Sequence, residues 1–231
     1  MSYRDTQSRV AEQLGTVRSR IERSCRRAFR RVDEVSIIGV TKTWPLDIVR
    51  AAIAAGIHDI GENRAQELAK KAEELPAGVH RWHMIGHLQR NKAKVVVRHA
   101  ASFHALDSVR LARALDRHAS EAGRVLDCFV QVNVSSETTK FGFDPHEVPR
   151  ALDELAAFDS IRVVGLMTLA APVEDPEDVR PQFSLLRRLS ESLPDAQLSM
   201  GMSGDFEVAV EEGATHVRLG SVLFGRRRSR T

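Results

Sequence analysis

The strongest constraint on the fold is an alternation of short apolar segments with amphipathic ones, repeated eight times along the 231 residues. The apolar segments predict strands, and the segments between them show the three- and four-residue spacing of helices. The predicted strands cover 35–41, 57–61, 80–85, 102–106, 126–133, 161–167, 197–200 and 215–219. The predicted helices cover 45–55, 64–75, 89–98, 108–122, 145–156, 178–193 and 203–212, with a short helical turn after Ser221.

One further helix is predicted within residues 1–30, ahead of the first strand. Its apolar stripe has spacings of four, three and four, at Val10, Leu14, Val17 and Ile21. Eight strand–helix units behind one extra helix predict an α/β fold, a (β/α)8 TIM barrel forming a single domain over 1–231 with a basic tail at 226–231. Periodicity does not demonstrate closure, so an open doubly wound sheet is the alternative. The first strand is not followed by Gly-x-Gly-x-x-Gly, which argues against a dinucleotide-binding sheet.

Composition narrows the class of protein. No stretch approaches the roughly 20 apolar residues of a membrane span, and residues 1–5 lack the apolar centre of a signal peptide. We therefore expect a cytoplasmic protein without membrane association. Cys25 and Cys128 are expected in a helix and a strand without metal-ligand spacing, so neither a disulfide nor a metal site is predicted.

Net charge is small, because 34 basic and 31 acidic residues leave +3. The basic excess is concentrated in 18–31 and 226–228. Such clusters can contact nucleic acid, but a solvated helix face and a basic tail explain them more simply. We do not expect a nucleic-acid partner.

Polar or small residues follow strand after strand, where each predicted strand ends. In a barrel these carboxyl ends meet at one face, which is where barrel enzymes carry their active sites. Each residue taken singly is compatible with an ordinary cap or loop, but their shared location predicts a site. The series is Lys42, Glu62, Asn63, Gly86, His87, Asp107, Asn133, Met167, Thr168, Ser203 and Arg218.

Two parts of this face carry more specific chemistry. Lys42 ends the first strand, where a partly buried amine can act as a nucleophile, the alternative being a solvated lysine. Ser203 and Gly220 lie in glycine-containing turns after strands seven and eight, where exposed amides can bind phosphate, the alternative being two capped helices. An amine facing a phosphate site suits pyridoxal 5′-phosphate, whose aldehyde forms a Schiff base. A cofactor-free Schiff-base aldolase acting on a sugar phosphate is the other reading.

The chain resembles the pyridoxal-phosphate homeostasis protein family. The matching segments span nearly the whole sequence and occur in one order. They are Gly39-Val40-Thr41-Lys42-Thr43, 61–67, 82–92, Val132-Asn133-Val134 with Glu137, Lys140 and Gly142, Gly165-Leu166-Met167-Thr168, 198–203 and Val217-Arg218-Leu219-Gly220. Trp44, Thr41 and Ile60 depart from the residues common in the family (lysine, serine and phenylalanine), and the last two could alter packing near the cofactor.

The resemblance implies a fold type III barrel, similar to the N-terminal domain of alanine racemase, that holds pyridoxal phosphate. It implies Lys42 as the Schiff-base lysine, Asn63 and Met167 as further cofactor contacts, and Arg218 near the pyridine nitrogen. It also implies that the phosphate is held by Ser203, Gly220 and Ser221.

The expected chemistry is binding rather than turnover. An arginine only donates hydrogen bonds, so a pyridine nitrogen facing Arg218 stays unprotonated and is a weak electron sink, although racemases of this fold act with such an arginine. Racemases of this type add a tyrosine from a second domain, whereas Tyr3 is the only tyrosine here; His83 and His87 are the candidate substitutes, although a packed or solvated histidine is the simpler reading. We therefore expect a monomeric carrier that stores the cofactor and releases it to pyridoxal-phosphate-dependent apoenzymes. A racemase or lyase of narrow specificity is the alternative.

Overall fold

The structure is a computed structural model that describes residues 3–75, 78, 80–135, 141–171 and 173–225. The basic tail expected at 226–231, and Glu137 and Lys140 of the family motif, lie outside the described residues. Among the described residues, no helix combines the length and apolar character that crossing a bilayer requires.

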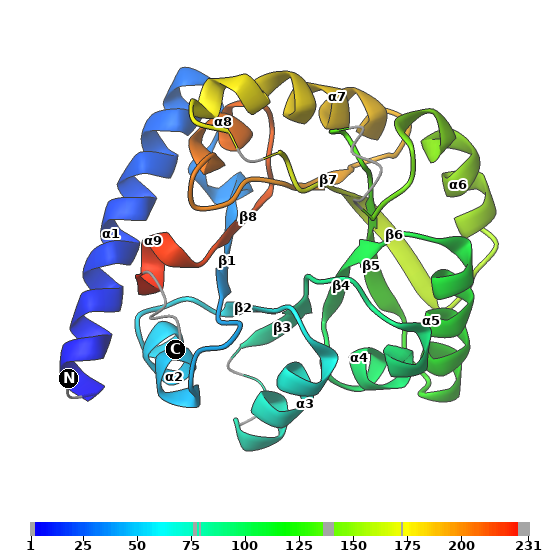
Figure 1. Cartoon of the computed structure of the whole chain (residues 1–231), viewed down its shortest axis with the longest axis horizontal. Helices are drawn as coiled ribbons and strands as arrows, with labels where there is room; N and C mark the ends of the chain where they lie inside the picture. The colour runs from blue at the N-terminus through cyan, green and yellow to red at the C-terminus, as the bar shows by residue number, and fades with distance from the viewer. Residues whose placement is uncertain (1–2, 76–77, 79, 136–140, 172, 226–231) are drawn as a thin grey trace.

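Eight parallel strands close into a barrel in sequence order, with β8 hydrogen-bonded back to β1 (Figure 1). This confirms the predicted (β/α)8 barrel and excludes the open sheet. The strands are β1 (Ser36–Val40), β2 (Asp59–Glu62), β3 (Arg81–Met84), β4 (Ser102–Leu106), β5 (Leu126–Gln131), β6 (Ile161–Met167), β7 (Gln197–Ser199) and β8 (His216–Leu219).

Helices surround the barrel and connect successive strands. The α-helices are α1 (Tyr3–Arg27), α2 (Leu46–Ala54), α3 (Ala65–Glu74), α4 (Ala93–His99), α5 (Val109–Glu121), α6 (Val148–Leu155), α7 (Arg180–Ser190), α8 (Phe206–Glu211) and α9 (Ser221–Phe224). Single 3-10 turns occur at η1 (Val32–Glu34), η2 (Arg90–Lys92), η3 (Pro145–Glu147) and η4 (Pro176–Val179). The predicted helices at 89–98, 145–156 and 178–193 each divide into such a turn and a shorter α-helix.

Local sequence explains several of these boundaries. The Ser108 hydroxyl accepts a hydrogen bond from the amide of Leu111, as expected of a residue that caps the start of α5. Gly123 follows the end of α5 with φ of +61°, a conformation that glycine adopts at no steric cost. The expectation for the helix at 203–212 was wrong at its start, because α8 begins at Phe206.

The leading helix α1 packs along the outside of the barrel against α2, α8 and α9 (Figure 1). Its predicted apolar stripe is buried, with exposures of 0 to 2% at Val10, Leu14, Val17 and Ile21. Cys25 is buried in the same helix, and Cys128 is buried in β5; both are free thiols. The stripe therefore attaches α1 to the side of the barrel that carries β1 and β8.

Candidate functional site

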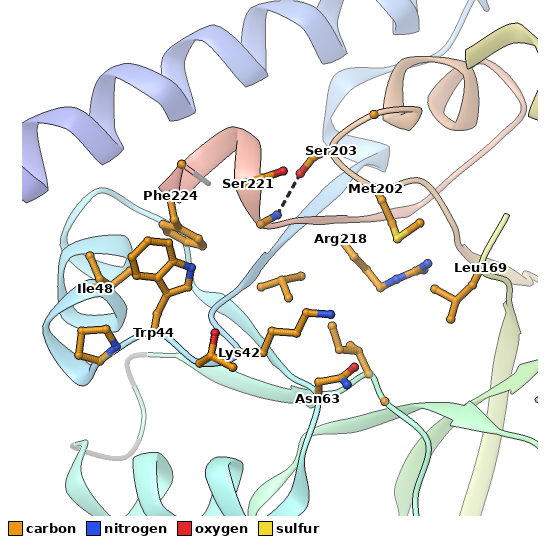
Figure 2. Close-up of a pocket in the computed structure, with 18 of the residues that line it drawn as sticks. Lys42, Trp44, Ile48, Asn63, Leu169, Met202, Ser203, Arg218, Ser221 and Phe224 are labelled. Atoms are coloured by element: carbon orange, nitrogen blue, oxygen red, sulfur yellow. Dashed lines mark hydrogen bonds between the residues drawn. The ribbon is translucent and has the colours of Figure 1, made fainter. Parts of the chain in front are cut away.

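A cavity of about 1810 Å³ opens at the carboxyl ends of the strands. It brings together six of the seven residues proposed from the sequence, drawn from four different strand ends (Figure 2). These six are Lys42, Asn63, Ser203, Arg218, Gly220 and Ser221. The predicted face of the barrel therefore carries a cavity that these six residues share.

Met167 is the residue that the structure does not place in the cavity lining. It is fully buried at the end of β6 and pairs in register with Gln131 and Ser199. Leu169, two residues further along, lines the cavity instead. The chain leaves the barrel after β6, so the residue that reaches the cavity comes from the loop rather than from the strand.

Lys42 extends from the end of β1 into the cavity and is half-buried. Figure 2 shows its side chain and those of Asn63 and Arg218 pointing into the same space. Trp44 forms part of the wall beside it, in an edge-to-face contact with Phe224 at a centroid distance of 6.5 Å. Lys42 therefore lies in the cavity lining, on the face where the sequence predicted it.

The backbone and side chain of Asn63 lie very close to Gly86, at the end of β3. A Cβ atom built on Gly86 would lie 2.3 Å from the Asn63 carbonyl oxygen and 2.6 Å from its Oδ1. Only glycine fits there without a shift. The glycine in the sequence segment after β3 thus lets the Asn63 amide stand at the cavity wall.

Ser203 joins the loops after β7 and β8. Its hydroxyl oxygen accepts hydrogen bonds from the amides of Gly220, at 3.2 Å, and Val222, at 3.3 Å. The alternative reading of these loops as two ordinary capped helices would have Ser203 cap the helix that follows it, whereas its hydroxyl binds the amides at the start of α9 instead. Two convergent N–H groups and a hydroxyl form a small site suited to an anion.

Asp205 does not oppose an anion at this point. Its carboxylate accepts a hydrogen bond of 2.6 Å from the amide of Met202 and is therefore directed into its own loop. Burial raises the pKa of the Asp205 carboxyl, and Arg218 partly opposes that rise. Gly204 lines the cavity, and no atom would lie within 4 Å of a Cβ there, so a ligand has room to approach this backbone.

Arg218 reaches the cavity from β8 and is 4% exposed. Hydrogen bonds of 2.8 Å to Ser199 Oγ and to the Thr168 carbonyl fix its guanidinium. Burial lowers its pKa to about 10, which still leaves it charged at neutral pH. Two of its five donors make these bonds, and a cavity-facing remainder can bind a hydrogen-bond acceptor.

A chain of hydrogen bonds continues from Arg218 into the barrel. Ser199 Oγ lies 2.9 Å from Nδ1 of His104, whose Nε2 is 3.0 Å from Nδ1 of His83. His83 Nε2 in turn lies 2.9 Å from the Asp59 carboxylate. Because Arg218 only donates, each group along the chain can donate to the next until the carboxylate is reached. The interior is thus a polar support for Arg218, which strand periodicity alone did not indicate.

The two histidines considered as acid–base groups lie in different places. His83 belongs to the buried interior chain and does not line the cavity. His87 does line it, with Nδ1 2.7 Å from the Asp107 carboxylate and its ring stacked on Phe141 at 3.7 Å. Of the two, only His87 can reach a ligand.

Further cavity residues were not foreseen from the sequence. Gln131, Phe141, Leu169 and Met202 contribute to the lining, and the last three are more than one-third exposed. The alternation of inward and outward side chains along β5 could have identified Gln131 as a lining residue, whereas loop residues show no periodicity. Among the described residues, no group of three or more His, Cys, Asp or Glu side chains is arranged so that it could hold a metal ion.

Comparisons with known proteins cover most of the chain. The family described as "Alanine racemase, N-terminal domain" matches residues 16–228. The pyridoxal phosphate homeostasis protein of Aquifex aeolicus is 40% identical over 225 residues, covering 95% of this chain and 99% of that protein. The protein of that description from Escherichia coli is 33% identical over 229 residues, covering 94% and 97%.

Solved structures extend the comparison. PipY of Synechococcus elongatus with PLP bound superposes with a TM-score of 0.81 at 34% identity, covering 94% of this chain and 100% of that one. Alanine racemase of Clostridium difficile gives a TM-score of 0.68 at 16% identity, covering 92% of this chain and 60% of that one, and so shares the fold.

Proposed function

Since the chain belongs to the pyridoxal phosphate homeostasis protein family, we propose that it binds pyridoxal 5′-phosphate through Lys42 and holds it for intracellular use. The observation that carries the proposal is the shared cavity. Lys42 reaches this cavity from the end of β1, and Ser203 and Gly220 line it from the loops after β7 and β8.

The residues present fit this cofactor. When bound, pyridoxal phosphate supplies an aldehyde that condenses with a primary amine, and Lys42 offers that amine. The amides of Gly220 and Val222, which donate to the Ser203 hydroxyl, would donate to the phosphate, with the Ser203 and Ser221 hydroxyls as further partners. Asn63 and Arg218 complete the set from the other strands.

Arg218 favours storage over catalysis. Its guanidinium is charged, fixed by Ser199 and Thr168, and a donor only. Opposite a ring nitrogen it would hold that nitrogen as an acceptor, without a proton. A ring in that state withdraws electrons poorly, so proton removal from an amino acid gains little from it.

The proposal is tested by comparing wild type with Lys42→Ala after loading with pyridoxal phosphate. Wild type is expected to show a visible absorption band that survives gel filtration, and borohydride reduction should fix one cofactor mass on the peptide containing Lys42. The alanine variant should remain colourless. A wild type without the band, or a variant with an equal one, refutes the proposal.

A racemase or lyase activity is the second candidate, and one observation favours it. His87 lines the cavity, and Asp107 orients its ring from Nδ1, an arrangement that leaves Nε2 to move a proton. Incubation with single amino acids in deuterated water would reveal exchange of the α-proton. Exchange at enzyme-like rates that disappears in His87→Gln would establish the activity, whereas background rates in both would dismiss it.

We also propose that the chain acts as a monomer and transfers its cofactor to apoenzymes. One chain supplies six of the seven contacts proposed from the sequence, and these six line one cavity. Sedimentation velocity measures the first point. For the second, the loaded protein should activate an apo-aminotransferase faster than an equal concentration of free cofactor, with the loaded protein behind a dialysis membrane as the control. Equal rates would exclude direct transfer.

A further inference from the structure

The backbone on both sides of Lys42 is held by charged side chains that lie outside the cavity. Lys71 on α3 is buried, and its Nζ donates to the Thr41 carbonyl at 2.8 Å. The same Nζ binds Glu62 Oε1 at 2.7 Å and Glu67 Oε1 at 2.8 Å. The residue before Lys42 is thus attached to a buried ion-pair cluster.

The residue after Lys42 is attached to the same cluster. The amide of Thr43 donates to Glu67 Oε1 at 2.6 Å. Thr43 has φ of +66°, in the left-handed region that β-branched residues rarely adopt. Glu67 therefore binds a backbone amide in a conformation that is unfavourable for threonine.

The hydroxyl of Thr41 strengthens the attachment. It donates to Glu62 Oε1 at 2.6 Å, and Glu62 is fully buried. Glu62, Glu67 and Lys71 are not among the residues that line the cavity, and their contacts with this segment are to Thr41 and Thr43. The influence of this cluster on the Lys42 amine passes through the backbone.

We propose that Glu67 and Lys71 are positioning residues: Lys71 binds the Thr41 carbonyl, Glu67 binds the Thr43 amide, and together they direct the Lys42 amine into the cavity. We call these two hydrogen bonds the grip. This inference rests on the proposed function for its consequence, but the grip itself is independent of any ligand. It assigns a role to the strained conformation of Thr43: the Trp44 amide donates to the Thr41 carbonyl at 3.0 Å and closes the turn, and Glu67 binds the Thr43 amide within that turn.

The grip is tested first without cofactor, by hydrogen exchange of the Thr43 amide followed by NMR. Glu67→Ala should raise the exchange rate about tenfold or more, since a lost hydrogen bond exposes the amide. Glu74→Ala, an exposed change on the same helix, is the matched control and should leave the rate unchanged. Equal exchange in wild type and Glu67→Ala would overturn the grip.

The consequence for Lys42 is tested by a double-mutant cycle with glycine at position 43. Glycine adopts the left-handed conformation without strain, so it should reduce the need for Glu67. We expect Glu67→Ala to weaken pyridoxal phosphate affinity about tenfold, and the same change in a Thr43→Gly background to weaken it about threefold or less. Glu67→Gln, which keeps an acceptor oxygen, should bind nearly as wild type.

The outcomes separate the possible failures. If the losses of affinity caused by Glu67→Ala and Thr43→Gly are additive, Glu67 acts through general stability and a positioning role is refuted. If Glu67→Ala alone does not fold, the double variant with Thr43→Gly and Glu67→Ala is compared with Thr43→Gly alone. A tenfold loss of pyridoxal phosphate affinity in that comparison would refute the inference. A wild type that forms no bond to the cofactor while Glu67→Ala still exposes the Thr43 amide would refute the proposed function and leave the grip standing.

Discussion

The hydroxyl of Ser203 accepts a hydrogen bond from the amide of Gly220, across 17 residues of sequence, at 3.2 Å. This bond closes the loop after β7 onto the loop after β8. The amides that donate to Ser203 could donate to a phosphate instead. Ligand binding would then replace the hydroxyl by a phosphate oxygen as the acceptor, without rebuilding the two loops.

Ser203→Ala is expected to weaken the binding of pyridoxal phosphate more than that of pyridoxal, which lacks the phosphate. A hydrogen bond to a charged group contributes about 1.5 to 3 kcal/mol, so the loss should be roughly tenfold or more for the phosphorylated ligand. Titration of both ligands, followed by absorbance, measures the difference. Equal losses for the two would place Ser203 away from the phosphate.

Gly86→Ala should destabilise the protein and displace Asn63. The added methyl group would lie 2.3 Å from the Asn63 carbonyl oxygen, a contact that forces a backbone shift. We expect a loss of about 1 to 3 kcal/mol in the free energy of unfolding, measured in urea. Gly15→Ala is the control: Gly15 is exposed in α1 and no atom would lie within 4 Å of its Cβ, so this change should add about 0.5 to 1 kcal/mol. Equal effects from the two would contradict the steric argument.

Acidification should destabilise the barrel through its interior histidines. Burial lowers the pKa of His216 to about 4, and the neighbouring His83 adds to the shift; burial also lowers the pKa of His104 well below its usual range. Between the folded and unfolded pKa values the unfolded chain binds more protons, so stability falls as pH decreases from about 6.5 toward 4.

For His216 alone the expected loss at pH 5 is about 2 kcal/mol relative to pH 8. Urea unfolding at several pH values measures it. His216→Gln should flatten the slope of stability against pH in this window. A slope identical to that of wild type would assign the acid sensitivity to other groups.

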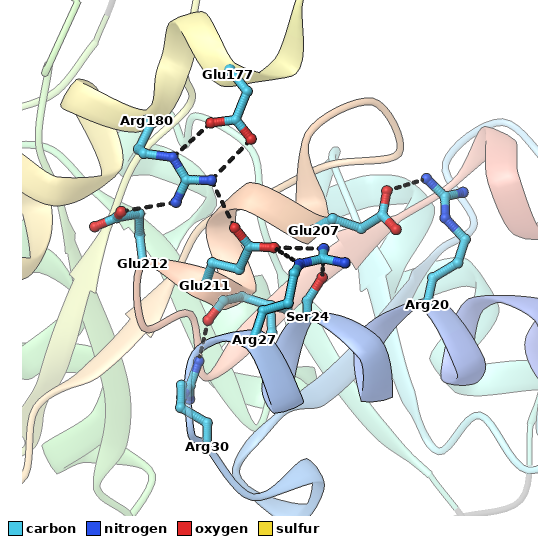
Figure 3. A network of polar contacts seen from close by, with 10 residues as sticks. Arg20, Ser24, Arg27, Arg30, Glu177, Arg180, Glu207, Glu211 and Glu212 are labelled. Atoms are coloured by element: carbon cyan, nitrogen blue, oxygen red, sulfur yellow. Dashed lines mark hydrogen bonds and ion pairs between the residues drawn. The ribbon is translucent and has the colours of Figure 1, made fainter.

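The ion pairs between α7, α8 and the leading helix should contribute measurably to stability. Arg180 binds Glu177 and Glu211 at 2.7 Å and Glu212 at 3.0 Å, with only about one-third of its side chain exposed (Figure 3). Arg180→Leu leaves two shielded carboxylates without this partner, so we expect a loss of about 1 to 2 kcal/mol in the free energy of unfolding.

The control for this prediction is Arg150→Leu, which removes an exposed pair with Glu154 at 2.9 Å. Exposed pairs contribute little, so the change should stay below about 0.5 kcal/mol. Both variants are compared by urea unfolding at low and high salt. A similar loss in the two would mean that the Arg180 network has no more effect than a surface pair.

The sequence located the secondary structure closely, because periodicity is a local property. The β4 and β6 boundaries agree with the predicted ranges, and the other strands differ by three residues or fewer at each end. It also indicated the hollowed face, since the carboxyl ends of parallel strands meet at one rim of a barrel. Lys42, Asn63, Ser203 and Arg218 follow from that rule together with their residue types.

What the chain alone determined is therefore the order of its elements and the side of the barrel on which its reactive groups gather. Only the tertiary structure decided the partners: that Ser203 binds the amides after β8 rather than its own helix, that Met167 stays behind the lining, and that Glu67 grips Thr43. The physical reason is distance along the chain. Periodicity reports which face a residue occupies, whereas a hydrogen bond between residues 17 or 24 positions apart is fixed only when barrel closure sets both loops in place.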